Sequence, residues 1–423
     1  MKEIRLGDQG TYVQYLQLAL SRAGIPTRID GIFGELTCRS VQAFFKEAGK
    51  CDVSSQDWER LLPFLKGYVD YTIKEGDTFW RLAEAYGTDA TKIMTANPEV
   101  DAEFLEIGTK IKIPFGFPVV AENVPYSSEL NELMIEGLAA RYPFIVKGEV
   151  GKSVMGKPIS YMRLGTGSGE VFYSAAYHAN EWITTPLLLR FAEEYARAYA
   201  AHKSMGGGVS AAALMENYTL YLLPMVNPDG VDLVNGVLEN AEYQGRAERI
   251  AADYPQIPFP SGWKANIDGI DLNLQFPAGW EMAREIKYAQ GFISPAPRDY
   301  VGPFPLAAPE SRAVYEFTRA HEFLLILAYH TQGEVIYWKY KDYEPERSLE
   351  IAEYFSSVSG YAVEETPGES GNAGYKDWFI QTYNRPGYTI EAGLGENPLP
   401  LTQFPQIYAD NYGIFVGGMT QAN

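Results

Sequence analysis

Two of the four histidines in this chain directly follow apolar, strand-like runs. His178 comes after "VFYSAAY", and His330 ends "LLILAYH". Glu181 lies three residues after His178, so a single turn can point both side chains at one ion. Two imidazoles and a carboxylate, with a fourth position open to water, are the ligands of a catalytic zinc site. Taken alone, a histidine at a strand end is more often a structural hydrogen-bonding residue. The other two, His202 and His321, fall in polar or amphipathic helical stretches and are predicted to lie on the surface.

Two carboxylates are candidates to support such a site. A ligating histidine needs an acceptor for its second ring nitrogen, and "IDGIDLNLQFP" offers Asp271 in a strand-to-loop stretch. A hydrolytic zinc also needs a general base beside its water, commonly a carboxylate in a cleft of low dielectric constant. Glu391 in "YTIEAG" ends an apolar run, where a surface glutamate would be out of place. A structural salt bridge is an equal alternative for Glu391.

The elements that must position these residues lie in one block, from about Tyr126 to Asn423. Strand-like runs such as "YTLYLLPMVNP" alternate there with helical stretches such as "TPLLLRFAEEYARAYA". This alternation predicts an α/β domain with a mainly parallel or mixed sheet and helices on both faces. Active residues gather at the C-terminal ends of strands in such folds. His178 and His330 are therefore expected at the same edge of the sheet.

Six segments of this block occur in the order found in zinc carboxypeptidases of the carboxypeptidase A type, which the block therefore resembles. They are "HANEW", "VNPDGV", "GIDLN", the histidine after "LILAY", "DWFI" and "YTIEAG". The resemblance implies a mixed-sheet carboxypeptidase-like fold with zinc held by His178, Glu181 and His330. It also implies that Asp271 supports a histidine and that a zinc-activated water attacks a peptide carbonyl. Glu391 would take the proton of that water and pass one to the leaving amine.

Two departures from the family pattern bear on the substrate. In the family, an arginine that pairs with the terminal carboxylate of the substrate follows the Gly-x-Asp-x-Asn segment, whereas Leu274 follows Asn273 here. Leucine cannot form a bidentate carboxylate clamp, although Asn273 could still contact a carboxylate or backbone group of the substrate. The family tyrosine upstream of the Asp-Trp pair has no aligned counterpart, because Tyr375 is off register. Cleavage within a chain is favoured over trimming of its end.

A third departure concerns the oxyanion. Bacterial relatives tend to carry an arginine just before the Gly-Val/Ile-Asp-Leu-Asn segment, and that position is Asp268 here. Loss of an oxyanion donor costs about 100- to 1000-fold in rate. Lys264 is the candidate replacement, and otherwise this enzyme would be slow.

Two small modules and a linker precede the block. "LGDQGTYVQYLQLAL" and "DGIFGELTCRSVQAFF" predict a helical module over residues 1–66 that resembles the peptidoglycan-binding domain of bacterial wall hydrolases; an unrelated three-helix domain is the alternative. "YTIKEGDTFWRLAEAYG", "ANPEV" and "LEIGTKIKIP" predict strand, helix, helix and strand over residues 67–115. This module looks like a LysM domain, which binds the N-acetylglucosamine-containing glycan of peptidoglycan or chitin. Proline-rich residues 116–125 form the linker, and residues 126–423 form the metallopeptidase domain.

Composition limits the partners and the location. The 54 acidic and 35 basic residues give a formal charge of −19, which argues against nucleic acid and anionic membrane surfaces as partners. A few placed cations could still bind an acidic substrate. Cys38 and Cys51 are too few for a disulfide framework and are interpreted as two small core or surface residues. No signal peptide or membrane-spanning run is visible, so a cytoplasmic or spore-associated protein is expected. The oligomeric state stays open.

The combined architecture, with "GIDLNLQFPAGWE" and "NPLP", resembles the γ-D-glutamyl-L-diamino acid endopeptidases of spore-forming bacilli. Those enzymes cut the bond between γ-D-glutamate and diaminopimelate in peptidoglycan stem peptides. The leading prediction is therefore a zinc-dependent peptidoglycan peptide hydrolase. A wall- or spore-associated binding protein with weakened catalysis is one alternative, favoured by Asp268. An ordinary zinc carboxypeptidase is another, disfavoured by Leu274.

Overall fold

A computed structural model describes residues 1–422 of the chain. The chain divides into two compact units. The first comprises Met1–Pro125 and Glu129–Val146, and the second comprises the rest of the described chain. The elements of the first unit are β1 (Ile4–Arg5), α1 (Thr11–Arg22), α2 (Glu35–Phe45), β2 (Asp52–Val53), α3 (Ser55–Lys66), β3 (Tyr68–Thr72), α4 (Phe79–Tyr86), α5 (Ala90–Ala96), β4 (Lys110–Pro114) and α6 (Ser128–Arg141).

The first module of this unit consists of α1, α2 and α3 with the short antiparallel pair β1 and β2. Val13, Leu16 and Leu20 recur at helical spacing on α1, and all three are buried. Helix α3 begins at a capping box, in which the Ser54 hydroxyl accepts from the backbone N–H of Asp57 and the Asp57 carboxylate accepts from the backbone of Ser54. Helices α1, α2 and α3 all lie within residues 1–66.

One disulfide fastens this module. The prediction that the two cysteines are unpaired core or surface residues is wrong, because Cys38 on α2 is bonded to Cys51 just before β2. Their Cα atoms lie 4.7 Å apart, within the range that a disulfide spans. The fold of α2 against β2 creates this proximity, and a count of cysteines along the sequence does not reveal it.

The second module has the predicted order of strand, two helices and strand. Strands β3 and β4 pair antiparallel from Tyr68↔Pro114 to Thr72↔Lys110. Helix α4 starts where the Thr78 hydroxyl accepts from a backbone N–H and ends at Gly87 in the left-handed conformation. Asn97 is buried and exchanges hydrogen bonds with the backbone of Lys112, which ties the end of α5 to β4.

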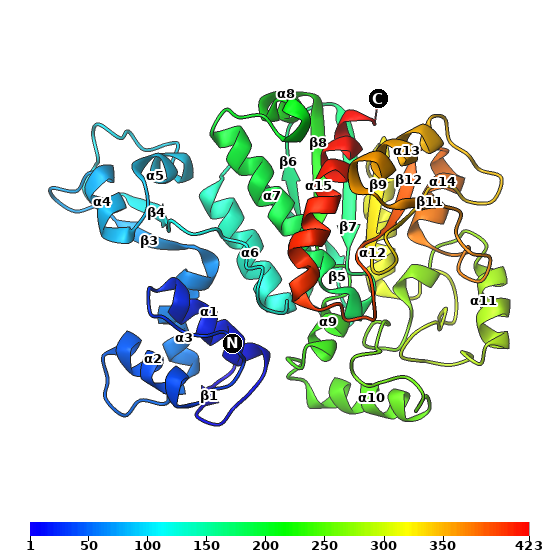
Figure 1. The fold of residues 1–423 in the computed structure, drawn as a ribbon, viewed down its shortest axis with the longest axis horizontal. Helices are drawn as coiled ribbons and strands as arrows, with labels where there is room; N and C mark the ends of the chain where they lie inside the picture. The colour runs from blue at the N-terminus through cyan, green and yellow to red at the C-terminus, as the bar shows by residue number, and fades with distance from the viewer. Residues whose placement is uncertain (423) are drawn as a thin grey trace. The chain divides into compact units, whose positions relative to one another are not determined.

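The second unit is built on an eight-stranded mixed sheet in the order β11-β10-β12-β9-β7-β8-β6-β5. Its strands are β5 (Val146–Lys152), β6 (Pro158–Leu164), β7 (Gly169–Ala175), β8 (Tyr218–Leu223), β9 (Leu325–His330), β10 (Val335–Tyr337), β11 (Ala362–Glu364) and β12 (Gly387–Glu391). Its helices are α7 (Thr184–Ala200), α8 (Ala211–Asn217), α9 (Pro228–Val234), α10 (Ala241–Ala252), α11 (Trp280–Ala289), α12 (Pro309–Arg319), α13 (Ser348–Ser359), α14 (Tyr375–Tyr383) and α15 (Phe404–Thr420). The predicted α/β fold with a mixed sheet is confirmed (Figure 1).

Helices cover both faces of the central strands. Successive side chains of a strand point to opposite faces, so neighbouring residues of β7 show what packs on each face. Phe172 of β7 belongs to the core cluster that includes Val314 of α12 and Phe379 of α14. The next residue, Tyr173, lies on the other face, where its hydroxyl donates to a carbonyl of α15 and its ring stacks on Phe415. Figure 1 shows α7 and α15 lying along that face. With both faces covered, the ends of the strands are left for a site.

His202 and His321 are the two histidines that do not follow strand-like runs. The prediction that His321 lies on the surface is wrong, because its half-buried ring stacks on Phe323 and its Nδ1 lies 2.7 Å from the carbonyl oxygen of Phe317. His202 is exposed, as predicted.

Within residues 1–422, none of the helices combines the length and the apolar character needed to cross a membrane.

Candidate active site

Three neighbouring parallel strands bring the candidate residues to one edge of the sheet. Strand β9 pairs in parallel with β7 on one side and with β12 on the other. His330 and Glu391 are the last residues of β9 and β12 and lie opposite each other in register. His178 follows the end of β7, and a single 3-10 turn, η1 (Ala179–Glu181), then carries Glu181 back towards it. The edge is the C-terminal one, as the sequence predicts.

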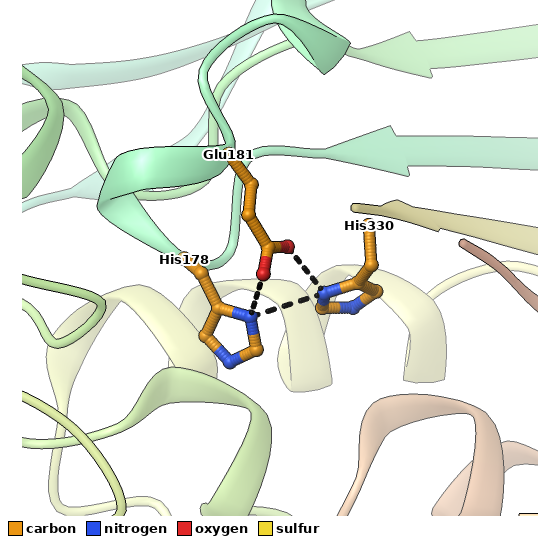
Figure 2. Close-up of side chains that lie close together, drawn as sticks. All are labelled: His178, Glu181 and His330. Carbon is orange, nitrogen blue, oxygen red and sulfur yellow. Dashed lines mark hydrogen bonds and ion pairs between the residues drawn. The ribbon is translucent and has the colours of Figure 1, made fainter. Parts of the chain in front are cut away.

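The side chains of His178, Glu181 and His330 converge on one point (Figure 2). One carboxylate oxygen of Glu181 lies 3.0 Å from Nδ1 of His178, and the other lies 3.0 Å from Nδ1 of His330. The two Nδ1 atoms are 3.2 Å apart. One ligand atom from each residue lies within 4.8 Å of the others.

This arrangement fits a metal ion better than a set of hydrogen bonds. Nε2 of His178 lies 3.1 Å from a carboxylate oxygen of Asp271, which fixes the proton on Nε2 and leaves a lone pair on Nδ1. That lone pair then faces the second imidazole and the carboxylate oxygens of Glu181. Nδ1 of His330 likewise faces Glu181 and His178, while its Nε2 is buried without a hydrogen-bond partner among the described residues. Two nitrogen ligands and a carboxylate are a zinc donor set.

Electrostatics favour a positive charge at the same point. Burial lowers the pKa of His178, but the carboxylates of Glu181 and Asp271 outweigh burial and raise it to about 9. Burial opposes ionisation of Asp271, but the His178 ring outweighs it and holds the pKa of Asp271 below its usual value. The pKa of His330 is lowered by burial. A pair of carboxylates that holds a proton on a buried imidazole would equally stabilise a divalent cation.

Asp271 occupies a fully bonded position behind His178. Its Oδ1 accepts from His178 and from the backbone N–H of Asn273, at 3.1 Å each. Its Oδ2 accepts from the backbone N–H of Asp299 at 3.1 Å. Asp271 therefore sets both the tautomer and the orientation of the histidine ring.

An acidic side chain, Glu391, and a basic one, Lys264, flank the converging ligands. Burial first, and then the nearby carboxylate of Glu181, raise the pKa of Glu391 to about 8. A carboxylate with a pKa near neutral pH is suited to take a proton and return it. The ammonium of Lys264 lies 2.8 Å from a carboxylate oxygen of Glu181. Burial lowers the pKa of Lys264, but Glu181 outweighs burial and raises it, so the cation persists.

Two cavities meet at this point. One has a volume of about 200 Å³ and also contains Asn273, Leu274 and Lys376 in its lining. The other runs past Asn180, Ser261 and Asn397. The residues common to both linings are His178, Lys264, Arg298, Tyr337 and Glu391. The candidate active site therefore adjoins both cavities.

Comparison with known proteins assigns the family. The zinc carboxypeptidase family profile matches residues 132–413, and the LysM domain profile matches residues 71–114. The chain belongs to the zinc carboxypeptidase family. It carries a LysM domain in front of the catalytic domain, as the sequence predicts. The cofactor of the family is zinc, and His178, Glu181 and His330 present a set of zinc ligands.

Relatives of the chain include bacterial and animal peptidases. It is 42% identical to gamma-D-glutamyl-L-diamino acid endopeptidase 1 of Lysinibacillus sphaericus over 409 residues, which cover 83% of this chain and all of that protein. It is 24% identical to carboxypeptidase B of Bos taurus, over 62% of this chain and 61% of that protein. The structure of bovine thrombin-activatable fibrinolysis inhibitor superposes with a TM-score of 0.55 at 17% identity, covering 71% of this chain and 98% of that chain. The last match shows the shared fold.

The positions that depart from the family pattern lie in different surroundings. Asp268 is outside both cavities and forms an ion pair with Arg246, whereas Lys264 is inside. Leu274 lines the first cavity, and Asn273 lines it too, with its side-chain oxygen accepting from the backbone N–H of Tyr375. The ring of Tyr375 is fully buried in the core. Of these residues, only Lys264 brings a cation to the zinc ligands.

Several further residues of the cavities are not marked by the sequence patterns, and three of them are Tyr337, Arg298 and Lys376. Tyr337 at the end of β10 and Arg298 in the loop before α12 line both of them. Lys376 lines the first cavity, where it forms a buried ion pair with Asp377. The "DWFI" segment pointed to Asp377 but not to its neighbour. No local pattern marks Arg298, because it lies in an irregular loop.

Proposed function

We propose that this zinc peptidase cuts the bond between γ-D-glutamate and a diamino acid in peptidoglycan stem peptides. The observation that carries the proposal is the pair of cavities that share His178 and Glu391, which offers room for substrate beyond a single pocket. Leu274 lines the wall of one cavity and offers no clamp for a terminal carboxylate. The likeness to an endopeptidase that is named for this bond supports the same conclusion.

The residues of the chain divide the chemistry between them. Zinc, when bound, acts as a Lewis acid that lowers the pKa of water and polarises the carbonyl. His178, Glu181 and His330 would hold it, and Asp271 orients the first of these. Glu391 accepts a proton from the attacking water and donates one to the leaving amine. Lys264 places a buried cation beside the site, where it stabilises the charge that develops on the carbonyl oxygen.

The charges of the first cavity suit an acidic, zwitterionic substrate. Lys264, Lys287, Arg298 and Lys376 bring four cations into a protein whose net charge is −19. Asp299 and Asp377 lie among them. A diaminopimelate residue ends in an ammonium and a carboxylate, so paired charges of both signs complement it.

The two N-terminal modules would bring the enzyme to peptidoglycan. The LysM domain supports binding of the glycan with its N-acetylglucosamine units, and the helical module of residues 1–66 would bind peptidoglycan beside it. Binding two neighbouring parts of one polymer raises the effective concentration of stem peptides at the active site. We place the protein in the cytoplasm or in the spore, where wall fragments reach it without secretion.

Mass spectrometry of a stem tetrapeptide after incubation with the protein tests this function. The substrate is L-Ala-γ-D-Glu-meso-diaminopimelate-D-Ala, with added zinc or with a chelator. Release of L-Ala-γ-D-Glu with zinc, lost with chelator, is the expected result. Loss of the final D-Ala alone would instead identify a carboxypeptidase. No product from a zinc-loaded protein would favour a wall-binding protein without useful catalysis.

A further inference from the structure

Arg298 is the basic residue of the cleft whose hydrogen-bonding groups are least used. Its side chain is 43% exposed and lines both cavities. Its Nε donates to Asp299 at 2.6 Å, and its two terminal nitrogens have no partner among residues 1–422. The other cations of the cleft are all engaged: Lys264 with Glu181, Lys287 with Asp299, and Lys376 with Asp377.

Asp299 holds the guanidinium, and the loop that carries Arg298 is fixed on both sides of this residue. Asp299 adopts a left-handed backbone conformation with φ of 64°, which is uncommon for a residue with a side chain. In this conformation its N–H reaches Asp271, and its carboxylate receives both Nε of Arg298 and the Lys287 ammonium, at 2.6 Å each. On the other side of Arg298, the carbonyl of Pro297 accepts from the backbone N–H of Lys264 at 2.7 Å.

These contacts connect Arg298 to the zinc site by a short path. Asp271 bonds Asp299 with one oxygen and His178 with the other. The loop that carries Arg298 is therefore fixed to the same carboxylate that orients a zinc ligand. A preorganised fork of N–H groups loses little entropy when it binds a planar anion.

A carboxylate is the anion that such a fork matches, through two parallel N–H bonds. A γ-linked glutamyl residue differs from an ordinary α-linked one in this respect. Its main chain runs through the side-chain carbonyl, so the α-carboxylate stays free, a short alkyl spacer away from the bond that is cut. An enzyme for this linkage must accommodate a charged group close to its reacting carbonyl, and a site that offers no cation there would leave the charge unpaired.

We propose that Arg298 determines specificity for the γ-linkage by binding the free α-carboxylate of the D-glutamyl residue at the cleavage site. The proposal rests on the function proposed above. Arg298 lines both cavities at their junction, so it can reach a group on the substrate that lies beside the reacting carbonyl. Arg298 would thereby offer the cation for a substrate carboxylate that Leu274 cannot offer.

Two stem tetrapeptides that differ at one group test the proposal. One carries D-glutamate with its free α-carboxylate, and the other carries D-isoglutamine, in which that carboxylate is a neutral carboxamide. The wild-type protein is expected to cut the first with a kcat/KM about 10- to 100-fold higher, the range of one charge-assisted hydrogen bond. In Arg298→Gln the ratio should fall close to one, mainly through a higher KM for the carboxylate peptide. Arg298→Lys, which keeps the charge without the fork, should give an intermediate ratio.

Three controls separate this role from a structural one. Arg312→Gln removes one positive charge from an exposed position on α12, outside both cavities, and should leave the ratio unchanged. Zinc content of Arg298→Gln should equal that of the wild type. In the Glu391→Gln background, where turnover is suppressed, calorimetry should show the same preference for the carboxylate peptide, and Arg298→Gln should remove it.

The outcomes distinguish the inference from the function on which it rests. If the wild type cuts both peptides equally at the γ-glutamyl bond, the function stands and the role of Arg298 is refuted. The same holds if Arg298→Gln cuts that bond with the wild-type preference. If the wild type loads zinc but cuts this bond in neither peptide, the proposed function is refuted, and the inference fails with it.

Discussion

Replacement of Asp271 by asparagine is the sharpest perturbation of the metal site that leaves every ligand in place. The carboxylate accepts three hydrogen bonds, two on Oδ1 from His178 and Asn273 and one on Oδ2 from Asp299. An asparagine side chain has one acceptor oxygen and one amide group. If its oxygen faces His178, its NH₂ meets the backbone N–H of Asp299, donor against donor. If it is flipped, the NH₂ faces the histidine ring and Asn273 instead.

The expected magnitude follows from this count. Either orientation loses at least one hydrogen bond to a charged acceptor, which contributes about 1.5–3 kcal/mol. Loss of the partner that orients a ligating histidine weakens metal binding by about 10- to 100-fold, which corresponds to about 1.4–2.7 kcal/mol. The two estimates agree. We therefore expect the zinc dissociation constant of Asp271→Asn to rise by one to two orders of magnitude.

Competition with a chromophoric chelator measures that dissociation constant without reference to activity. Asp268→Asn is the matched control, since it makes the same chemical change three residues upstream. Asp268 pairs with Arg246 and contacts no zinc ligand, so this variant should bind zinc like the wild type. Equal zinc affinity of Asp271→Asn and the wild type would refute the reasoning, and so would an equal loss in both variants.

Three further predictions concern catalysis and stability. Glu391→Gln should lower kcat at least about 100-fold while zinc content, measured by atomic emission, stays at the wild-type value; retained turnover would exclude Glu391 as the base. Lys376→Met should lower the free energy of unfolding by about 3–5 kcal/mol, measured in urea, because it leaves Asp377 charged, buried and without its cation; a loss below about 1 kcal/mol would show that the pair contributes little. Burial raises the pKa of Glu310 from 4.5 to about 7, so the native state holds this proton to higher pH than the unfolded chain does. The stability that Glu310 contributes is complete below about pH 4.5 and falls by about 3 kcal/mol as pH rises through 7. Urea titrations at several pH values should show this decline in the wild type and a smaller one in Glu310→Gln, and parallel curves would contradict the assignment.

The sequence predicts most of the fold and identifies those site residues that lie in short-range patterns. The apolar runs before His178 and His330 predict β7 and β9, and the rule that parallel strands end at one edge then predicts their proximity. Glu181 follows from its spacing to His178 along one turn. Glu391 follows from an acidic residue at the end of an apolar strand. The structure places all four side chains together, and their catalytic roles stay predictions.

What the sequence does not reveal depends on tertiary contacts. Arg298 reaches the cleft because Asp299 takes an unusual backbone conformation that Asp271 and Lys287 stabilise, and no periodic pattern encodes such a loop. Prediction of the Cys38–Cys51 bond requires knowledge of how α2 packs beside β2. A pattern of polar and apolar residues predicts elements and faces, whereas these contacts depend on which irregular segments meet.

Anomalous diffraction at the zinc absorption edge, from crystals grown with zinc, tests the central claim most directly. One strong peak is expected at the C-terminal edge of the sheet, within bonding distance of Nδ1 of His178, Nδ1 of His330 and the carboxylate of Glu181. Glu391 should lie next to that peak without binding it. A peak bound through Nε2 of either histidine, or a strong peak elsewhere with none at this triad, would contradict the account.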